Sequence, residues 1–281
     1  MTIIQLQQLV DDYFQANERA LPWRVLDSSG ALDSYHVLVS ELMLQQTQAR
    51  RVVPNYQQFL REFPTVADLA AAPLASVLTA WSGLGYNRRA KFLHQTAQIL
   101  VEAFEGTAPD SIDELRALPG IGVNTAAAIY VYSFNKPAVF VETNVRSVFI
   151  HHFFADRTDV ADSDVLKLVA KSLTLPVVAR DPRRWYWSLM DYGVYIKTEY
   201  GNASRRSKHH TRQAAFEGSR RQARGAVIKQ LTEGAAGRAT LLRATKDYPG
   251  FEAVLDDLIR EGLVEQKNGR FQLAEGDILS R

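Results

Sequence analysis

The stretch LPGIGVNTAAAI, residues 118–129, decides how this chain folds. It lies between two segments whose apolar residues recur with the period of a helix. Pro119 and Gly120 end the first segment, and Gly122 directly precedes the second. A helix, a tight glycine turn and a second helix form a helix–hairpin–helix unit.

Such a hairpin exposes backbone groups that can bind an anion. The N–H groups near Gly120 and Gly122 have no partner within a helix, and they lie at the positive end of the helix that starts near Val123. Glycines let a phosphate approach closely, and such a site reads backbone rather than base sequence. The alternative is an ordinary corner between two helices.

Helical periodicity covers most of the chain, which predicts an all-α fold. The Asn268-Gly269 pair is typical of a hairpin turn, so helices followed by a short hairpin predict a winged-helix-like module at 217–281. The predicted helices are residues 3–17, 34–48, a third that starts near Pro54, 65–72, 73–83, 87–106, 110–118, 124–134, 143–154, 162–173, 182–198, 219–234 and 250–264.

The composition excludes several kinds of chemistry. The 281 residues include no cysteine, which excludes disulfides, thiol catalysis, thiolate zinc sites and cysteine-ligated iron–sulfur clusters. No apolar run reaches about 18 residues, so no membrane span is expected. The first residues have early acids and no basic region of the kind that opens a signal peptide, so we expect a cytoplasmic protein.

Positive charge is concentrated in one segment. The net charge is only +2, but residues 204–229 carry eight Lys or Arg against one Glu. A basic stripe is typical of a phosphate-binding surface, and the alternative is a solvated face.

Glu41 is the first candidate for catalysis. It lies amid Leu38, Val39, Leu42 and Leu44, and an unpaired carboxylate is costly to bury there. Burial would raise its pKa and keep it protonated near neutral pH, as a general acid requires. The alternative is a Glu on the exposed face of an amphipathic helix.

Two further segments are candidates for nucleic-acid contact. Glutamine amides can reach base edges or wedge into a stack, and an aromatic residue between glycines and arginines suits base stacking. The residues are Gln45, Gln46 and Gln48 in the first segment and Tyr86, Arg88 and Arg89 in the second. The alternatives are solvent-facing glutamines and a loop with a packed tyrosine.

Glu142 lies where an apolar extended run meets the start of a helix. The helix dipole favours a carboxylate there, and Thr143 or Asn144 could cap the helix. In the functional interpretation the same helix end keeps Glu142 ionised, so that it stabilises a developing positive charge.

These segments together resemble the helix–hairpin–helix DNA glycosylase superfamily, and most closely its adenine DNA glycosylase (MutY-type) branch. The similarity runs from about residue 5 to residue 195. The matching stretches are LPWR at 21–24, SELMLQQTQ at 40–48, FPTVADLAAAPLASVLTAWSGLGY at 63–86, LPGIGVNTAAAI at 118–129, VETNVRSV at 141–148 and LMDYG at 189–193.

The resemblance implies a fold and a domain organisation. It implies a two-lobed helical glycosylase core over residues 1–216 that extrudes the target base from double-stranded DNA into a cleft. One lobe would span about 30–133 and the other 1–29 plus 134–198. A basic loop at 199–216 would stand where relatives bind an iron–sulfur cluster.

The resemblance also implies roles for single residues. Glu41 would protonate the base and activate water, and Glu142 would stabilise the positively charged sugar. The hairpin from Leu118 to Val123 would grip phosphate, with Na⁺ or K⁺ on carbonyls such as that of Leu118. Gln45, Gln46 and Tyr86 would contact DNA near the lesion.

Asn124 stands where bifunctional relatives have a lysine that forms a Schiff base with the sugar. An amide cannot form one, so we expect attack by water and an abasic product.

Three departures accompany the resemblance. Glu142 replaces an aspartate, which moves the carboxylate by roughly 1–1.5 Å. The cluster cysteines correspond to Lys197, Ser204, Ser207 and Gln213, so we expect no cofactor and a loop held by salt bridges and by Phe216. The module at 217–281 is too short for the usual NUDIX-like domain, which leaves open how the opposite base is recognised.

The leading hypothesis is a monofunctional base-excision glycosylase that removes adenine opposite 8-oxoguanine or guanine. The alternatives are a thymine or uracil mismatch glycosylase and a catalytically weak lesion-binding protein. We expect a monomer that associates with the bacterial nucleoid when on DNA. Arg205, Arg206 and Lys208 of the basic loop are expected to touch phosphate.

Overall fold

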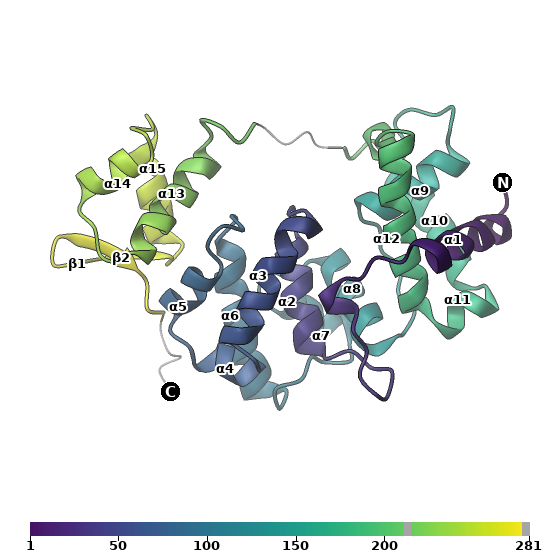
Figure 1. The fold of residues 1–281 in the computed structure, drawn as a ribbon, viewed down its shortest axis with the longest axis horizontal. Helices are drawn as coiled ribbons and strands as arrows, with labels where there is room; N and C mark the ends of the chain where they lie inside the picture. Colours follow the sequence, from purple (N-terminus) through teal and green to yellow (C-terminus); the bar gives the residue numbers. More distant parts are fainter. Residues whose placement is uncertain (211–214, 277–281) are drawn as a thin grey trace. The chain divides into compact units, whose positions relative to one another are not determined.

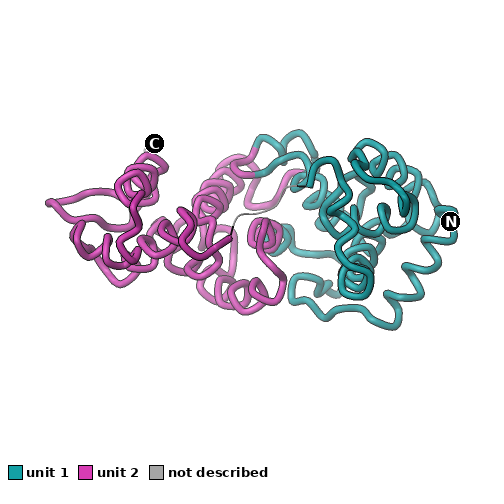
Figure 2. The backbone as a smooth tube through the Cα atoms, turned by 90° about the horizontal axis from the view of Figure 1, so that it is seen from above, with its two compact units in different colours: residues 1–37, 110–117, 121–212 teal, residues 38–109, 118–120, 213–281 magenta. Residues whose placement is uncertain are grey.

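The computed structural model describes residues 1–210 and 215–276. The chain forms two compact units, which Figure 2 colours separately. Unit 1 comprises Met1–Val37, Asp110–Ala117 and Ile121–Arg212, and unit 2 comprises Leu38–Pro109, Leu118–Gly120 and Gln213–Arg281. No helix of the described ranges has the length and apolar character that a membrane crossing needs.

Unit 1 is built around α12 (Pro182–Glu199), which packs against α1, α8, α9 and α11 (Figure 1). Its elements are α1 (Ile3–Asn17), η1 (Pro22–Arg24), α7 (Ile112–Ala117), α8 (Val123–Phe134), α9 (Thr143–Phe153), α10 (Asp162–Leu173), α11 (Pro176–Arg180), α12 and η2 (Ala203–Arg206).

The aromatic residues of α12 make it the core helix of unit 1. The ring of Tyr186 stacks on that of Phe140 with centroids 4.0 Å apart, and its hydroxyl donates to the carbonyl of Ala138 at 2.8 Å. Trp185 donates from its indole nitrogen to Ser172 Oγ at 3.0 Å. These buried polar atoms therefore keep hydrogen-bond partners, which spares the core their desolvation cost.

Unit 2 places its helices around α6 (Arg88–Ala103), which packs against α4 and α5. The boundary between the units falls within α2 (Ser34–Leu44), so its second part belongs to unit 2. The remaining helices of this part are α3 (Ala49–Glu62), α4 (Val66–Ala71) and α5 (Leu74–Ala80).

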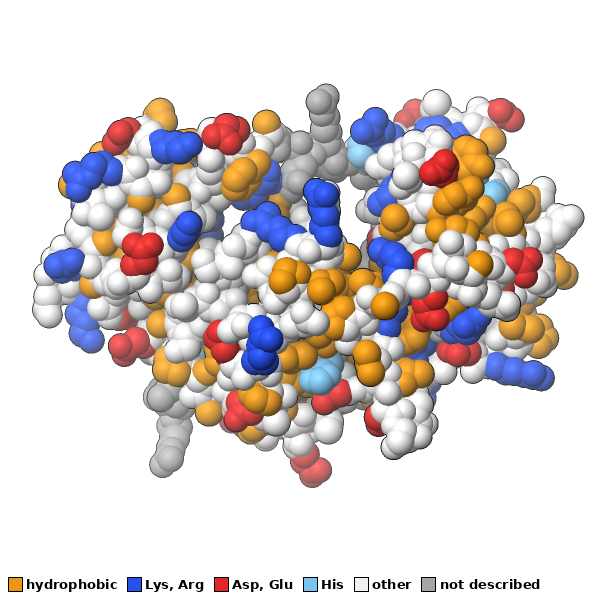
Figure 3. Space-filling model, in the orientation of Figure 1, with side chains coloured by type: hydrophobic (Ala, Val, Ile, Leu, Met, Phe, Trp, Pro, Cys, Tyr) orange, Lys and Arg blue, Asp and Glu red, His pale blue; other side chains and the backbone are white. Residues whose placement is uncertain are grey.

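The C-terminal module belongs to unit 2 and packs through α13 and β2 on α5. It comprises α13 (Arg220–Thr232), α14 (Arg238–Ala244), α15 (Phe251–Arg260), β1 (Val264–Lys267) and β2 (Arg270–Leu273). The two strands are antiparallel, and Ala236 adds a bridge to Phe271. This order is winged-helix-like. Figure 3 shows Lys and Arg side chains interspersed with carboxylates on this module.

The all-α prediction and the C-terminal hairpin are confirmed. Asn268 and Gly269 both have positive φ angles, +52° and +75°, as the predicted two-residue turn requires. The periodicity missed the short helices α11 and α14.

Two predicted helix boundaries are wrong. The helix predicted for 34–48 ends at Leu44, because Gln46 takes a left-handed backbone with φ +54°. The next helix begins at Ala49 rather than near Pro54, which lies inside it and removes one main-chain hydrogen bond.

The compact units also divide the chain differently from the predicted lobes. Residues 110–117 and 121–133 belong with unit 1 rather than with the predicted lobe 30–133, because α7 and α8 pack on each other and α8 packs on α12.

Candidate active site

Glu41 lies in the part of α2 that belongs to unit 2. Its side chain is half-buried, and the neighbouring Leu42 and Met43 are fully buried. Glu41 therefore lies at the edge of an apolar core. It is neither fully buried nor fully exposed, the two alternatives that the sequence left open.

Arg89 joins the end of α2 to the loop before α6. Its guanidinium donates to the carbonyls of Leu42, Met43 and Gln45 at 2.6, 2.9 and 2.7 Å, and to that of Gly85 at 3.1 Å. Burial lowers the pKa of Arg89 to about 10, which still leaves it charged at neutral pH. The prediction that Arg89 contacts DNA is wrong: it is buried, and it satisfies carbonyls that the helix end leaves open.

The glycine-rich loop before α6 places Tyr86 in an uncommon backbone conformation. Gly83, Gly85 and Tyr86 have φ angles of +93°, +73° and +50°. A tyrosine in the left-handed region is disfavoured, and such outliers concentrate at functional sites. Tyr86 is half-buried, whereas the predicted contact residue Arg88 is exposed and lies over the ring of Phe92.

The hairpin turn packs directly on α6. A Cβ at Gly120 would come within 2.7 Å of Cδ2 of Phe92, and φ is +74° there, so only glycine fits. The carbonyl of Pro119 accepts from Thr96 Oγ1 at 3.2 Å, and that of Gly120 accepts from Gln45 Nε2 at 3.4 Å. Gln45 thus ties the turn to α2.

The other hairpin residues differ in exposure, and phosphate binding by the hairpin stays a prediction. Leu118 is buried, whereas Gly122 and Val123 are exposed, and Gly122 is the N-cap of α8. A monovalent cation on the Leu118 carbonyl stays a prediction. Gln46 is exposed, and Gln48 is the exposed N-cap of α3.

Asn124, in the first turn of α8, is held by a backbone group beside Glu142. Its Nδ2 donates to the carbonyl of Val141 at 3.0 Å. The amide therefore connects the start of α8 to the segment that leads into α9.

Glu142 is itself the N-cap of α9. Its Oε1 accepts from the backbone N–H groups of Asn144 and Val145 at 2.6 and 2.8 Å, and its Oε2 lies 3.3 Å from Asn144 Nδ2. The capping interpretation is confirmed, with Glu142 rather than Thr143 or Asn144 as the cap.

The electrostatics of Glu142 combine opposing effects. Burial raises the pKa of Glu142, while the two backbone N–H groups and the charges of Lys197 and Arg146 lower it, and burial dominates. The prediction that the helix end favours the charged form of Glu142 holds for the two N–H hydrogen bonds, but the net shift of the pKa is upward because burial outweighs them.

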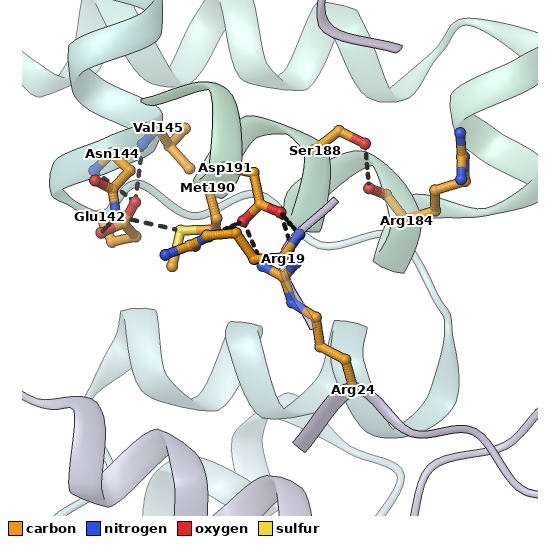
Figure 4. A network of polar contacts seen from close by, with 9 residues as sticks. All are labelled: Arg19, Arg24, Glu142, Asn144, Val145, Arg184, Ser188, Met190 and Asp191. Carbon is orange, nitrogen blue, oxygen red and sulfur yellow. Dashed lines mark hydrogen bonds and ion pairs between the residues drawn. The ribbon is translucent and has the colours of Figure 1, made fainter. Parts of the chain in front are cut away.

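Gly193 lets α12 approach the start of α9. A Cβ at this position would meet the backbone oxygen of Asn144 at 2.6 Å and its Cβ at 2.7 Å. Asn144 Nδ2 also lies 3.8 Å from the sulfur of Met190 (Figure 4). The absence of a side chain at Gly193 thus allows α12 to pack closely against the first turn of α9, next to Glu142.

Asp191 connects α12 to the N-terminal segment. It is buried and takes a two-point salt bridge from Arg24, with both distances 2.9 Å, as well as a hydrogen bond from Arg19 Nε at 2.6 Å (Figure 4). The motifs LPWR and LMDYG therefore meet in one ion-pair network, whose role is to hold α12 in place.

The basic loop is held by backbone pairing and by one arginine. Val160 accepts from Lys208 N at 3.0 Å and donates to the carbonyl of Arg206 at 2.9 Å. The guanidinium of Arg206 donates to the carbonyls of Ile150, Phe154 and Ala155 at the end of α9. Arg206 therefore caps the end of α9, and its predicted contact with phosphate stays a prediction.

The exposed Arg205 and Lys208 keep that prediction. Phe216, expected to help hold the loop, is 53% exposed and contacts Arg221 of α13.

Three of the four positions that replace cluster cysteines are described. Ser204 and Ser207 are buried and hydrogen-bonded to Asn202 and Asp162, and Lys197 is half-buried on α12. Gln213 lies outside the described residues. Within residues 1–210 and 215–276, no three His, Asp or Glu side chains gather as a metal site would need.

Comparison with known proteins agrees with this architecture. A family model described as "HhH-GPD superfamily base excision DNA repair protein" matches residues 39–172. An adenine DNA glycosylase of Mycolicibacterium smegmatis is 32% identical over 94% of this chain and 95% of its own length.

The chain belongs to the adenine DNA glycosylase branch of the HhH-GPD superfamily. An adenine DNA glycosylase of Mycobacterium tuberculosis is 33% identical over 93% of this chain and 91% of its own length. The chain spans 53% of the Buchnera aphidicola relative, which is 33% identical. A thermostable thymine-DNA glycosylase shares the fold, with a TM-score of 0.58 and 20% identity over 72% of this chain and 90% of that one.

The predicted site residues fall in both compact units. Glu41, Gln45, Tyr86 and the turn at Gly120 belong to unit 2. Asn124 and Glu142 belong to unit 1, with the basic loop.

Sequence reasoning missed the residues that support this glycosylase site. Asn144 hydrogen-bonds Glu142 and packs against Gly193, and the charge of Lys197 acts on Glu142. Arg221 contacts Tyr86 from α13. The glycine of LMDYG was a usable signal, since a glycine within a helix costs stability unless a close contact requires it.

Proposed function

We propose that this protein is a monofunctional DNA glycosylase that hydrolyses the N-glycosidic bond of adenine opposite 8-oxoguanine or guanine. Membership of the family supports DNA glycosylase activity in general. The mycobacterial relatives, similar over nearly their whole length, are adenine DNA glycosylases, which supports adenine as the base removed.

The proposed chemistry uses the two glutamates in turn. Glu41 gives a proton to the leaving adenine, and the bond between the base and the sugar C1′ breaks with its electron pair on the base. Glu142, when ionised, stabilises the positive charge left on the sugar. A water molecule then adds its oxygen to C1′ and returns a proton to the Glu41 carboxylate.

Asn124 is the single observation that carries the monofunctional assignment. Its amide has no amine to attack the sugar, and it donates to the carbonyl of Val141. Without a nucleophilic amine at this position, water is the proposed nucleophile and an intact abasic strand is the product.

A panel of duplexes tests the proposal. Adenine opposite 8-oxoguanine, A:G, T:G, U:G and an undamaged control are each incubated with the protein, with and without alkali. We expect strand breaks only after alkali, and only in the two adenine duplexes. Breaks without alkali would contradict the monofunctional assignment, and breaks in T:G or U:G alone would contradict adenine.

Glu41→Gln tests the acid. We expect loss of excision with binding of the adenine duplex retained, because the amide has nearly the same shape and no proton to give. Glu102→Gln, at an exposed position on α6, is the matched control and is expected to excise at the wild-type rate. An active Glu41→Gln variant would show that another residue is the acid.

A further inference from the structure

A series of contacts between aromatic rings and arginines links the C-terminal module to the core of unit 2. The Arg221 Cζ atom lies 5.5 Å from the ring centroid of Phe216 and 5.6 Å from that of Tyr86. The Arg89 Cζ atom lies 5.4 Å from the ring centroids of both Tyr86 and Trp81. The ring of Tyr86 is therefore near two arginines from different parts of the chain.

The two arginines hold Tyr86 in different ways. Arg89 is buried and bound to backbone carbonyls, including that of Gly85 just before Tyr86. Arg221 donates from Nη1 to the Tyr86 hydroxyl at 2.8 Å, so it fixes the tip of the side chain. Together with the cation–π contacts, this hydrogen bond leaves the ring little freedom to rotate.

The C-terminal module, which carries Arg221 on α13, is anchored on the rest of unit 2. Lys91 of α6 donates to the carbonyl of Glu261 at 2.7 Å, and Leu74 N donates to the carbonyl of Glu275 at 2.9 Å. Along α13, Ala223 and Val227 are buried. Arg221 is therefore held against Tyr86 by a packed module rather than by a loose tail.

The conformation of Tyr86 needs such support. Its φ angle of +50° follows two glycines that also have positive φ, so the local backbone is a costly one for a tyrosine. A ring that is to stack against a nucleic-acid base binds best when it is already immobile, because its rotational entropy is then lost before binding.

We propose that Arg221 positions Tyr86 for contact with duplex DNA, which makes the C-terminal module part of lesion recognition. This rests on the proposed function, in which Tyr86 meets DNA near the target base. The module then acts through a side chain of the glycosylase core.

The test measures lesion preference rather than affinity alone. The probe is a duplex with a tetrahydrofuran abasic analogue opposite 8-oxoguanine, which cannot be cleaved, and the reference is the same undamaged duplex. The preference is the dissociation constant for the undamaged duplex divided by that for the abasic duplex. For Arg221→Ala we expect this ratio to fall about 2- to 12-fold, which corresponds to the free-energy cost of immobilising one side chain.

Arg220→Ala is the matched control. It removes the same charge from the adjacent position of α13, and Arg220 contacts Asp257 and the carbonyl of Ala253 instead of Tyr86. We expect this variant to bind both duplexes alike, with an unchanged ratio. A fall of the same size in both variants would show a general charge effect and would overturn the inference.

A double-mutant cycle separates positioning from direct contact. In a Tyr86→Ala background, Arg221→Ala is expected to have no further effect on the ratio, because the ring that it positions is gone. An equal effect in both backgrounds would show that Arg221 contacts DNA by itself and would overturn the inference.

The inference and the proposed function fail in different ways. A wild-type protein that excises adenine and prefers the abasic duplex, together with an unaltered ratio in Arg221→Ala, overturns the inference alone. A wild-type protein that excises no base and has no lesion preference overturns the proposed function and the inference with it. Thermal unfolding of each variant shows that the module is still folded.

Discussion

At the scale of the single residue, Glu142 serves two needs that oppose each other. As the N-cap of α9 it accepts two backbone hydrogen bonds, and its burial raises its pKa. In the proposed reaction it must be ionised. A carboxylate with a raised pKa is therefore a stability cost at neutral pH that the chemistry requires.

Glu142→Gln is expected to lose activity and to gain stability at high pH. Because the folded-state pKa is raised, the wild-type protein loses stability as pH rises through that pKa, whereas the amide has no charge to bury and its oxygen can still cap α9. The advantage of the variant is expected to vanish below about pH 4, where an ordinary Glu is already protonated.

Urea unfolding at pH 4, 6 and 8 checks this prediction. If the stability advantage of the variant grew toward pH 4, the predicted direction of the pH dependence would be wrong. The activity of the wild-type protein is expected to decline on acidification at a higher pH than an unperturbed Glu would give.

Replacement of Gly193 is expected to destabilise the contact between α12 and the start of α9. Gly193→Ala would place a methyl group 2.6 Å from the backbone oxygen of Asn144, which must then move together with the cap at Glu142. Overpacking of this kind costs about 1–3 kcal/mol, and we expect activity to fall as well.

Gly225→Ala on α13 is the control for that measurement. A Cβ there meets nothing within 4 Å, so alanine is expected to stabilise the helix by about 0.5–1 kcal/mol. If chemical denaturation gave both variants the same change, close packing at Gly193 would not be the cause.

At the scale of the element, two arginines complete helix ends that the backbone leaves open. Arg89 binds carbonyls at the end of α2, and Arg206 binds those at the end of α9. In the second case the arginine also ties down the basic loop. A guanidinium with several donors suits this role, because it can satisfy more than one carbonyl at once.

Arg206→Ala and Arg205→Ala are expected to separate structure from binding. Removal of the capping arginine leaves part-buried carbonyls unsatisfied, at a cost of about 1–3 kcal/mol in unfolding free energy. Arg205 is exposed, so its removal is expected to leave stability unchanged and to flatten the salt dependence of DNA binding. Thermal unfolding and salt titrations of both variants measure the two effects. The reverse pattern would contradict the assignment.

At the scale of the whole molecule, the C-terminal module belongs to the same compact unit as Gln45, the turn at Gly120 and the loop that carries Tyr86. The module packs on α5, whose Leu74 and Val77 are almost fully buried. The module is therefore expected to stabilise unit 2, besides the role in recognition proposed above.

A chain that lacks residues 217–281 is expected to be less stable and more prone to aggregate. Removal of the module uncovers the apolar side of α5 and removes the partner of Lys91. Hydrogen exchange across α5 and α6 is expected to rise, while that in α9 and α12 stays as in the full chain. Unchanged protection in α5 would show that the module folds independently of it.

The sequence by itself determined the family, the helical class and the elements that carry Glu41, Asn124 and Glu142, because helix periods, glycine turns and motifs are local. Only the tertiary structure decided which arginines are scaffold, why Gly193 is a glycine, and that Arg221 meets Tyr86. These facts depend on side chains from distant segments that meet only after packing, and on burial that alters their charges. A residue type in a motif predicts where chemistry can occur, whereas its neighbours in space determine whether its charge is free to act.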